Sequence, residues 1–106
     1  MKRKLMPLFE GETDLKPAKT FGQTLRRQRR LMEISQGALA ELSGVSETHI
    51  KRLEKDIPDP GMNVIFRLSN ALELTPGELL TNAYADWREK TLEDPDNPTV
   101  RSSITK

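Results

Sequence analysis

Residues 36–54 constrain the fold of this chain more than any other stretch, because two amphipathic segments are joined there by a very short connection. Their apolar residues recur at helical spacing: Leu39, Ala40 and Leu42 in the first segment, and Val45, Ile50 and Leu53 in the second. Gly44 can adopt the positive φ that often ends a helix, and Ser46 is a good cap for the next one. The stretch therefore predicts two helices that cross steeply at a tight turn.

The second of these helices also predicts a ligand-binding surface. With Ile50 and Leu53 in the core, the 3.6-residue period turns five polar or charged side chains outward: Glu47, Thr48, Lys51, Arg52 and Lys55. This arrangement is typical of the helix-turn-helix motif, whose second helix enters the major groove of DNA. The outward side chains are therefore candidates for reading base pairs.

Composition limits the alternatives. The chain has 106 residues, of which 35% are hydrophobic, so one small core is expected. It has no cysteine for a disulfide or a thiolate metal site, no apolar run near the roughly 20 residues of a membrane span, and no export signal, which indicates a soluble cytoplasmic protein. The net charge of +1 argues weakly against nucleic-acid binding. However, seven of the eight basic residues between positions 20 and 83 fall in two predicted helices, at 26–30 and 51–55.

The remaining segments predict an all-α fold of five helices. The first helix is expected at about 21–32 with Thr20 as its cap, the fourth at about 62–72, and the fifth from Pro76, capped by Thr75 and continuing toward Leu92. Further core positions are expected at Phe21, Leu25, Gln28, Met32, Val64 or Ile65, Leu68, Leu72, Leu79, Leu80 and Ala83. We divide the chain into a flexible arm (1–19), a DNA-binding domain (20–83), and a helix extension with a disordered tail (84–106).

Over residues 21–80 the sequence resembles the Cro/C1-type helix-turn-helix family. The matching features, in order, are Arg29, Gln36, Leu39-Ala40, Gly44-Val45-Ser46, Ile50, Leu53-Glu54, Pro60, Ala71-Leu72, Pro76 and Leu79-Leu80. The resemblance implies a compact domain like those of phage repressors, with a recognition helix at about 46–56 in the major groove. It also implies a structural ion pair between Arg29 and Glu54.

The resemblance further implies which residues contact DNA. Base contacts are expected from Glu47, Thr48, Lys51 and Arg52, and phosphate contacts from Gln36, Ser46, His49, Arg26 and Lys55. Arg52 can donate two hydrogen bonds to guanine, a contact worth about 1–3 kcal/mol of discrimination, and Glu47 could accept one from the cytosine amino group. No metal or other cofactor is expected.

Several of these residues also have a purely structural interpretation. Arg26, Arg27 and Arg30 could form a solvated helix face, Glu47 could serve only to stabilise the start of its helix, and His49 and Gln36 could be ordinary surface residues. The acidic loop at 56–60 departs from the family pattern and would repel phosphates if it faced them. The basic N-terminal residues 2–4 could instead follow a groove of the DNA.

These observations favour a transcriptional regulator, most simply a repressor, that binds a dyad in double-stranded DNA as a homodimer. Tyr84 and Trp87 are the expected dimer contacts, although Trp87 could fold back on its own domain. Catalysis is not expected, because the chain has one histidine, no cysteine and no glycine-rich phosphate loop. The alternatives are a protein-interaction module and an antitoxin-like autorepressor whose tail holds a protein partner.

Overall fold

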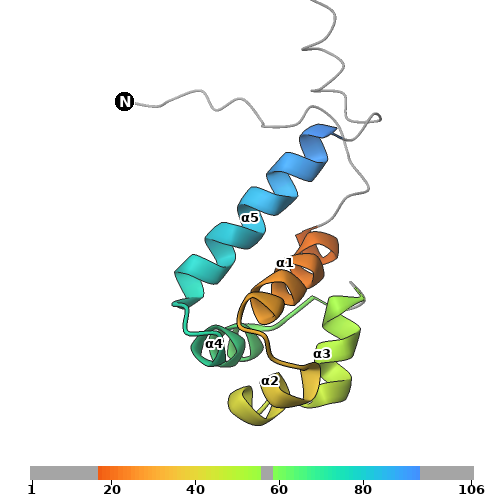
Figure 1. Ribbon diagram of the computed structural model, residues 1–106. Helices are drawn as coiled ribbons and strands as arrows, with labels where there is room; N and C mark the ends of the chain where they lie inside the picture. Colours follow the sequence, from red (N-terminus) through yellow and green to blue (C-terminus); the bar gives the residue numbers. More distant parts are fainter. Residues whose placement is uncertain (1–16, 56–58, 94–106) are drawn as a thin grey trace, which may run out of the picture.

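The computed structural model describes residues 17–55 and 59–93 of the protein, and all of its regular structure there is helical. The five helices are α1 (Pro17–Leu31), α2 (Gln36–Ser43), α3 (Glu47–Glu54), α4 (Met62–Ala71) and α5 (Pro76–Glu93) (Figure 1). The predicted all-α, five-helix fold is therefore confirmed. Residues 1–16 of the predicted arm (1–19), residues 94–106 and positions 56–58 of the acidic loop lie outside the described residues. The last three residues of the predicted arm, 17–19, instead form the first turn of α1.

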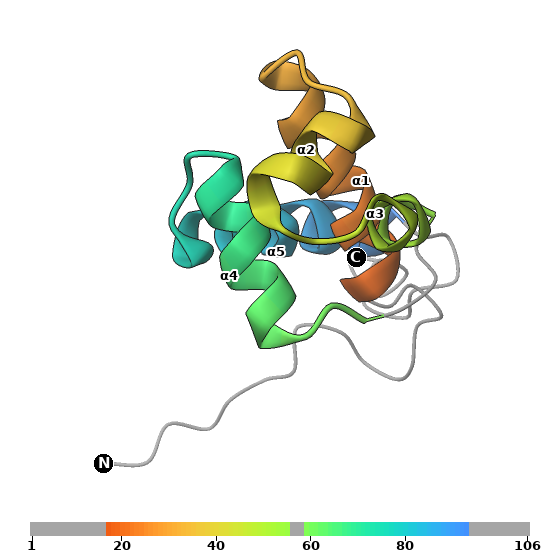
Figure 2. The ribbon, with the colours of Figure 1, turned by 90° about the horizontal axis from the view of Figure 1, so that it is seen from below.

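One apolar core joins the five helices. Its fully or nearly fully buried residues are Phe21, Leu25, Leu39, Val45, Ile50, Leu53, Leu68, Leu72 and Leu79. Helix α1 packs against α3 on one side and α5 on the other, while α2 packs against α3 and α4. Figure 2 views the molecule from the side of α2, α3 and α4, with α5 behind them. The C-terminal half of α5 lies at the opposite end of the molecule from α2 and α3 (Figure 1).

The turn that joins α2 to α3 has the predicted chemistry at both boundaries. Gly44 has a φ of 76°, and its N–H donates to the Ala40 carbonyl. Ser46 accepts a hydrogen bond from the His49 N–H at 3.1 Å, so its hydroxyl caps the start of α3. The turn thereby fixes the direction in which α3 leaves α2.

The start of α5 carries a reciprocal cap. The Thr75 hydroxyl accepts from the Glu78 N–H at 3.0 Å, and Glu78 accepts in return from the Thr75 N–H at 2.8 Å. The predicted cap at Thr75 is confirmed, and the helix continues past residue 84 without a break to Glu93. None of the helices within the described ranges is long and apolar enough to cross a membrane.

Three sequence-based expectations were wrong, one about a helix cap and two about the core. Thr20 does not cap α1, because the helix begins at Pro17 and the buried Thr20 hydroxyl donates back to the Pro17 carbonyl at 3.1 Å. Proline is favourable in a first helical turn, which explains the earlier start. Leu42 and Leu80 are 59% and 45% exposed, so neither belongs to the core. In α2 and α5 the core fully covers Leu39 and Leu79, and Ala40 and Ala83 are partly buried against it.

Candidate nucleic-acid interface

The two faces of α3 differ sharply in exposure. Ile50 and Leu53 are 0% and 1% exposed, because they pack into the core against α1 and α2. The opposite face is open to solvent and holds the polar residues Glu47, Thr48, Lys51 and Arg52, with Lys55 directly after the helix. His49 is half-buried between the two faces. The structure thus brings the candidate base-contacting side chains together on one accessible surface, which we call the α3 face.

An ion pair lies on the α3 face. Glu47 Oε2 is 3.3 Å from Lys51 Nζ, and about half of each side chain is exposed. The other carboxylate oxygen, Oε1, lies beside the first turn of α2, 3.2 Å from where a β-carbon on Gly37 would be. Two of the four candidate base contacts are therefore engaged with one another.

A second, buried ion pair connects α1 to the C-terminal end of α3. Arg29 donates from Nε to Glu54 Oε2 at 2.7 Å and from Nη2 to Oε1 at 3.0 Å, and a further bond from Nη1 reaches the Ile34 carbonyl at 2.8 Å. The hydrogen bond to Glu54 raises the pKa of the Arg29 guanidinium above its ordinary value. The structure therefore contains the ion pair that the family resemblance implies.

Gln36 belongs to the same network. Its Nε2 donates to Glu54 Oε1 at 3.0 Å, so the amide at the start of α2 is held by α3. Around this network is an open depression of about 380 Å³, lined by Arg26, Arg29, Gln36, Lys51, Glu54 and Lys55. Arg26 of α1, Lys51 of α3 and Lys55, which directly follows α3, are exposed. Three cations around one polar depression provide a suitable surface for an anion such as a DNA phosphate.

The structure also reveals a contact that sequence reasoning missed. Asp86 of α5 accepts a hydrogen bond from the Thr24 hydroxyl at 2.6 Å and lies 2.8 Å from Arg27 Nη1. Arg27 therefore connects α1 to α5 through an ion pair, although its side chain is 48% exposed. Arg26 and Arg30 are exposed as well. Thr24 and Asp86 are 62 positions apart, and nothing in the local sequence around either residue indicates the pairing.

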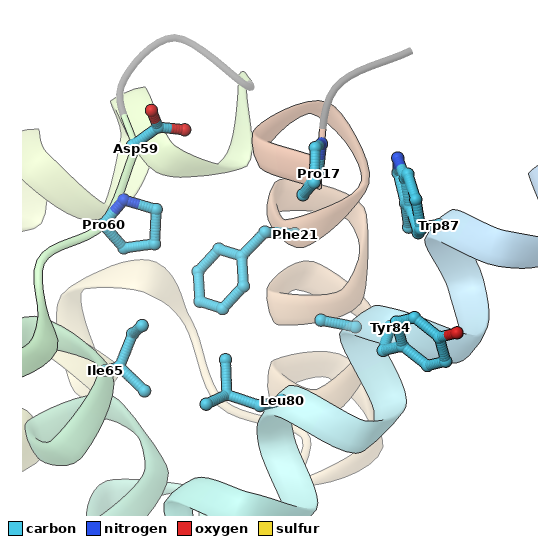
Figure 3. Close-up of a pocket in the computed structure, with 9 residues that line it drawn as sticks. Pro17, Phe21, Asp59, Pro60, Ile65, Leu80, Tyr84 and Trp87 are labelled. Atoms are coloured by element: carbon cyan, nitrogen blue, oxygen red, sulfur yellow. The ribbon is translucent and has the colours of Figure 1, made fainter. Parts of the chain in front are cut away.

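Tyr84 and Trp87 line an apolar groove between α1, α4, α5 and the residues at 59–60 that precede α4 (Figure 3). Their ring centroids are 6.0 Å apart with the planes inclined by 39°, and Tyr84 is 53% exposed. The groove has a volume of about 510 Å³, and its apolar walls are Pro17, Phe21, Pro60, Ile65, Leu80 and Ala83 together with the two aromatic rings.

Within the described ranges, no cluster of three or more potential metal ligands occurs.

Comparisons with known proteins identify the fold and the family. The family model HTH_3, described as helix-turn-helix, matches residues 25–79, which is more than half of the chain. The restriction-modification controller protein C.AhdI from Aeromonas hydrophila is 34% identical, over 58% of this chain and 94% of its own, with a TM-score of 0.57. The DNA-binding domain of the P22 C2 repressor is 33% identical, over 57% of this chain and 79% of its own, with a TM-score of 0.54.

A more distant structure extends the likeness of fold over a larger part of the chain. The clp gene regulator ClgR from Corynebacterium glutamicum has a TM-score of 0.69 over 74% of this chain and 84% of its own, at 20% identity. No curated protein matches the sequence. The family model covers the whole α2–turn–α3 unit and the ion pair behind it, so the chain belongs to the Cro/C1-type helix-turn-helix family of DNA-binding transcriptional regulators.

Proposed function

We propose that this protein is a sequence-specific repressor that binds a dyad operator in double-stranded DNA, with α3 as its recognition helix in the major groove. The observation that carries the proposal is the division of α3 into a fully buried apolar face and an exposed polar face. A helix held from behind by Leu53 and by the Arg29–Glu54 pair can present its outer side chains to base edges in a fixed orientation.

The proposed contacts follow from the chemistry of the exposed side chains. Arg52 donates to guanine O6 and N7, the Thr48 methyl group contacts a thymine methyl, and Glu47 accepts from a cytosine amino group. Lys51 contacts either a base or the backbone. The proposed phosphate contacts are Arg26, Gln36, Ser46, His49 and Lys55, which lie around the polar depression and at the first turns of α2 and α3.

Self-association through α5 is the second part of the proposal. One recognition helix reads only a few base pairs, so useful specificity requires two half-sites about one helical turn apart. The apolar groove that Tyr84 and Trp87 line provides a suitable surface, because none of the proposed DNA-contacting residues lines it (Figure 3). Two copies related by a two-fold axis would each present the same aromatic pair to the other.

The test of DNA reading is selection of bound sequences from random duplexes, followed by affinity measurements across a salt series. We expect an enriched dyad, and Arg52→Ala should lose preference at one base position per half-site at a cost of about 1–3 kcal/mol. Arg88→Ala is the matched control, because it removes the same charge from the exposed end of α5. No enrichment and no binding at low salt would exclude DNA reading and favour a protein-interaction module.

Self-association is tested separately by sedimentation of Tyr84→Glu against wild type. A charge placed on the exposed aromatic pair should convert the dimer to a monomer, whereas Ala85→Glu, which adds the same charge at the next position of α5, should not. Equal self-association of the two variants would place the dimer contacts elsewhere. A protein partner bound through residues 1–16 or 94–106 would involve only residues that the structure does not describe.

A further inference from the structure

The carboxylate of Glu47 lies on the surface at which the phosphates and bases of DNA are expected to arrive. Two features favour this position: Lys51 lies one helical turn later, and the free N–H groups in the first turn of α3 favour a negative charge. Because Gly37 has no side chain, Glu47 Oε1 can approach the first turn of α2 closely. The α3 face of the free protein therefore carries a negatively charged side chain of its own.

This anion competes with DNA for the same cation. Lys51 Nζ is 3.3 Å from Glu47 Oε2, so a phosphate that binds Lys51 must displace the carboxylate or share the lysine with it. The pair is about half exposed on both sides, and such pairs are weak enough to exchange partners. Once Lys51 has moved to the DNA, Glu47 is left beside a polyanion and gains a new partner only where a base offers a donor.

We propose that Glu47 is a specificity-determining residue of this interface, alongside Arg52, and acts by penalising the wrong sequences. The inference rests on the proposed function. On a matching site a cytosine amino group donates to Glu47 and compensates for the loss of Lys51. On other sequences Glu47 either retains Lys51, which costs the DNA one phosphate contact, or remains unpaired next to phosphates. Discrimination then comes from a repulsive element rather than from an additional attraction.

The inference predicts that removing the charge of Glu47 makes DNA binding tighter and less selective. Glu47→Gln should bind non-specific duplex about 3- to 10-fold more tightly at 0.1 M salt. The plot of log K against log salt should steepen by about 0.9, because the released Lys51 neutralises one further phosphate. The ratio of specific to non-specific affinity should fall by at least the same 3- to 10-fold, since the operator loses its contact to Glu47 while other sequences gain.

Two matched variants separate this mechanism from a general effect of net charge. Glu41→Gln removes the same charge from the exposed surface of α2, and Glu41 takes part in none of the ion pairs among the described residues. It should leave the salt slope at the wild-type value. The double variant Glu47→Gln with Lys51→Gln should return the steepened slope to wild type, because the lysine that makes the added contact is gone.

The outcomes distinguish this inference from the proposed function. If wild type selects a dyad but Glu47→Gln behaves like Glu41→Gln, only the inference is overturned. It is also overturned if the steeper slope persists without Lys51. If wild type binds no DNA at any salt concentration, both the proposed function and the inference are overturned. A steeper slope that depends on Lys51, together with reduced selectivity, supports both.

Discussion

Helix α3 carries one ion pair at each end, and the two pairs play different parts. At the C-terminal end, Arg29 Nε lies 2.7 Å from Glu54 Oε2, and the two side chains are only 10% and 5% exposed. At the N-terminal end, Glu47 Oε2 lies 3.3 Å from Lys51 Nζ, and the two side chains are 49% and 54% exposed. The comparison teaches that burial, not charge, decides whether an ion pair fixes the helix or leaves its side chains available to a ligand.

The chemistry of the partners reinforces the difference. Arg29 presents a rigid fork that makes two bonds to the Glu54 carboxylate and a third to the Ile34 carbonyl, and Gln36 adds a donor to the same carboxylate. Loss of one partner would leave a charge in the protein interior. Lys51 is a flexible point charge whose loss exposes Glu47 only to water. The first pair therefore anchors α3, and the second can be exchanged.

The largest expected effect is at the buried pair. Arg29→Ala should destabilise the fold by about 3 kcal/mol, because it leaves the Glu54 carboxylate without its charged partner and removes a bond to the α1–α2 connection. Urea unfolding measures the change. Arg30→Ala, the exposed neighbour on α1, should cost less than about 0.5 kcal/mol. Equal costs for the two variants would remove the basis of the comparison.

The next effect concerns the turn at Gly44, which precedes the N-terminal end of α3. This is the end that carries the exposed Glu47–Lys51 pair. Gly44→Ala forces a β-carbon into a backbone with a φ of 76° and places it 2.8 Å from Arg67 Nη1. We expect a loss of about 1–2 kcal/mol in unfolding free energy. Gly61→Ala is the control, since Gly61 has a φ of −79° and nothing lies within 4 Å of an added β-carbon. A loss in both variants would indicate a general cost of replacing glycine.

Much of this arrangement could be predicted from sequence because its causes are local. Gly44, Ser46 and Thr75 mark helix boundaries through their own backbone and side-chain chemistry, and the spacing of Ile50 and Leu53 determines which face of α3 is exposed. The Glu47–Lys51 ion pair was not predicted, although residues four apart on a helix are neighbours on its surface. The position of Glu47 beside the first turn of α2 depends on how the two helices pack.

The expectations that failed depend on the tertiary arrangement. Helical spacing placed Leu42 and Leu80 with the core, but the number of apolar residues that the neighbouring helices cover is not encoded in the spacing. The hydrogen bond between Thr24 and Asp86 links residues 62 positions apart, so it could not be read from either segment. Similarly, the engagement of Gln36 by Glu54 arises only after α2 and α3 have packed together.

A smaller effect is expected at the cap of α3, and it separates stability from DNA binding. Ser46→Ala removes the acceptor for the His49 N–H and should cost about 1 kcal/mol in unfolding free energy. Ser46→Asp retains a capping oxygen and should restore most of that stability, while its charge should weaken DNA binding because it faces the phosphates. If Ser46→Asp has both the stability and the DNA affinity of wild type, the capping side chain does not face the DNA phosphates.

The smallest effect is expected at the exposed pair, and it tests the comparison most directly. Lys51→Ala removes a partner of Glu47 that is half in solvent, so the unfolding free energy should fall by no more than about 0.3–0.5 kcal/mol. Urea unfolding at low and high salt measures it, and salt should shrink the difference because the pair is open to ions. Arg67→Ala is the control, because it removes an exposed hydrogen bond of 3.2 Å from Arg67 to Asn63, which also lies four residues away. Its effect on the unfolding free energy should be of similar size. A loss above about 1 kcal/mol at Lys51 would make the pair structural, and a structural pair could not release its lysine to DNA.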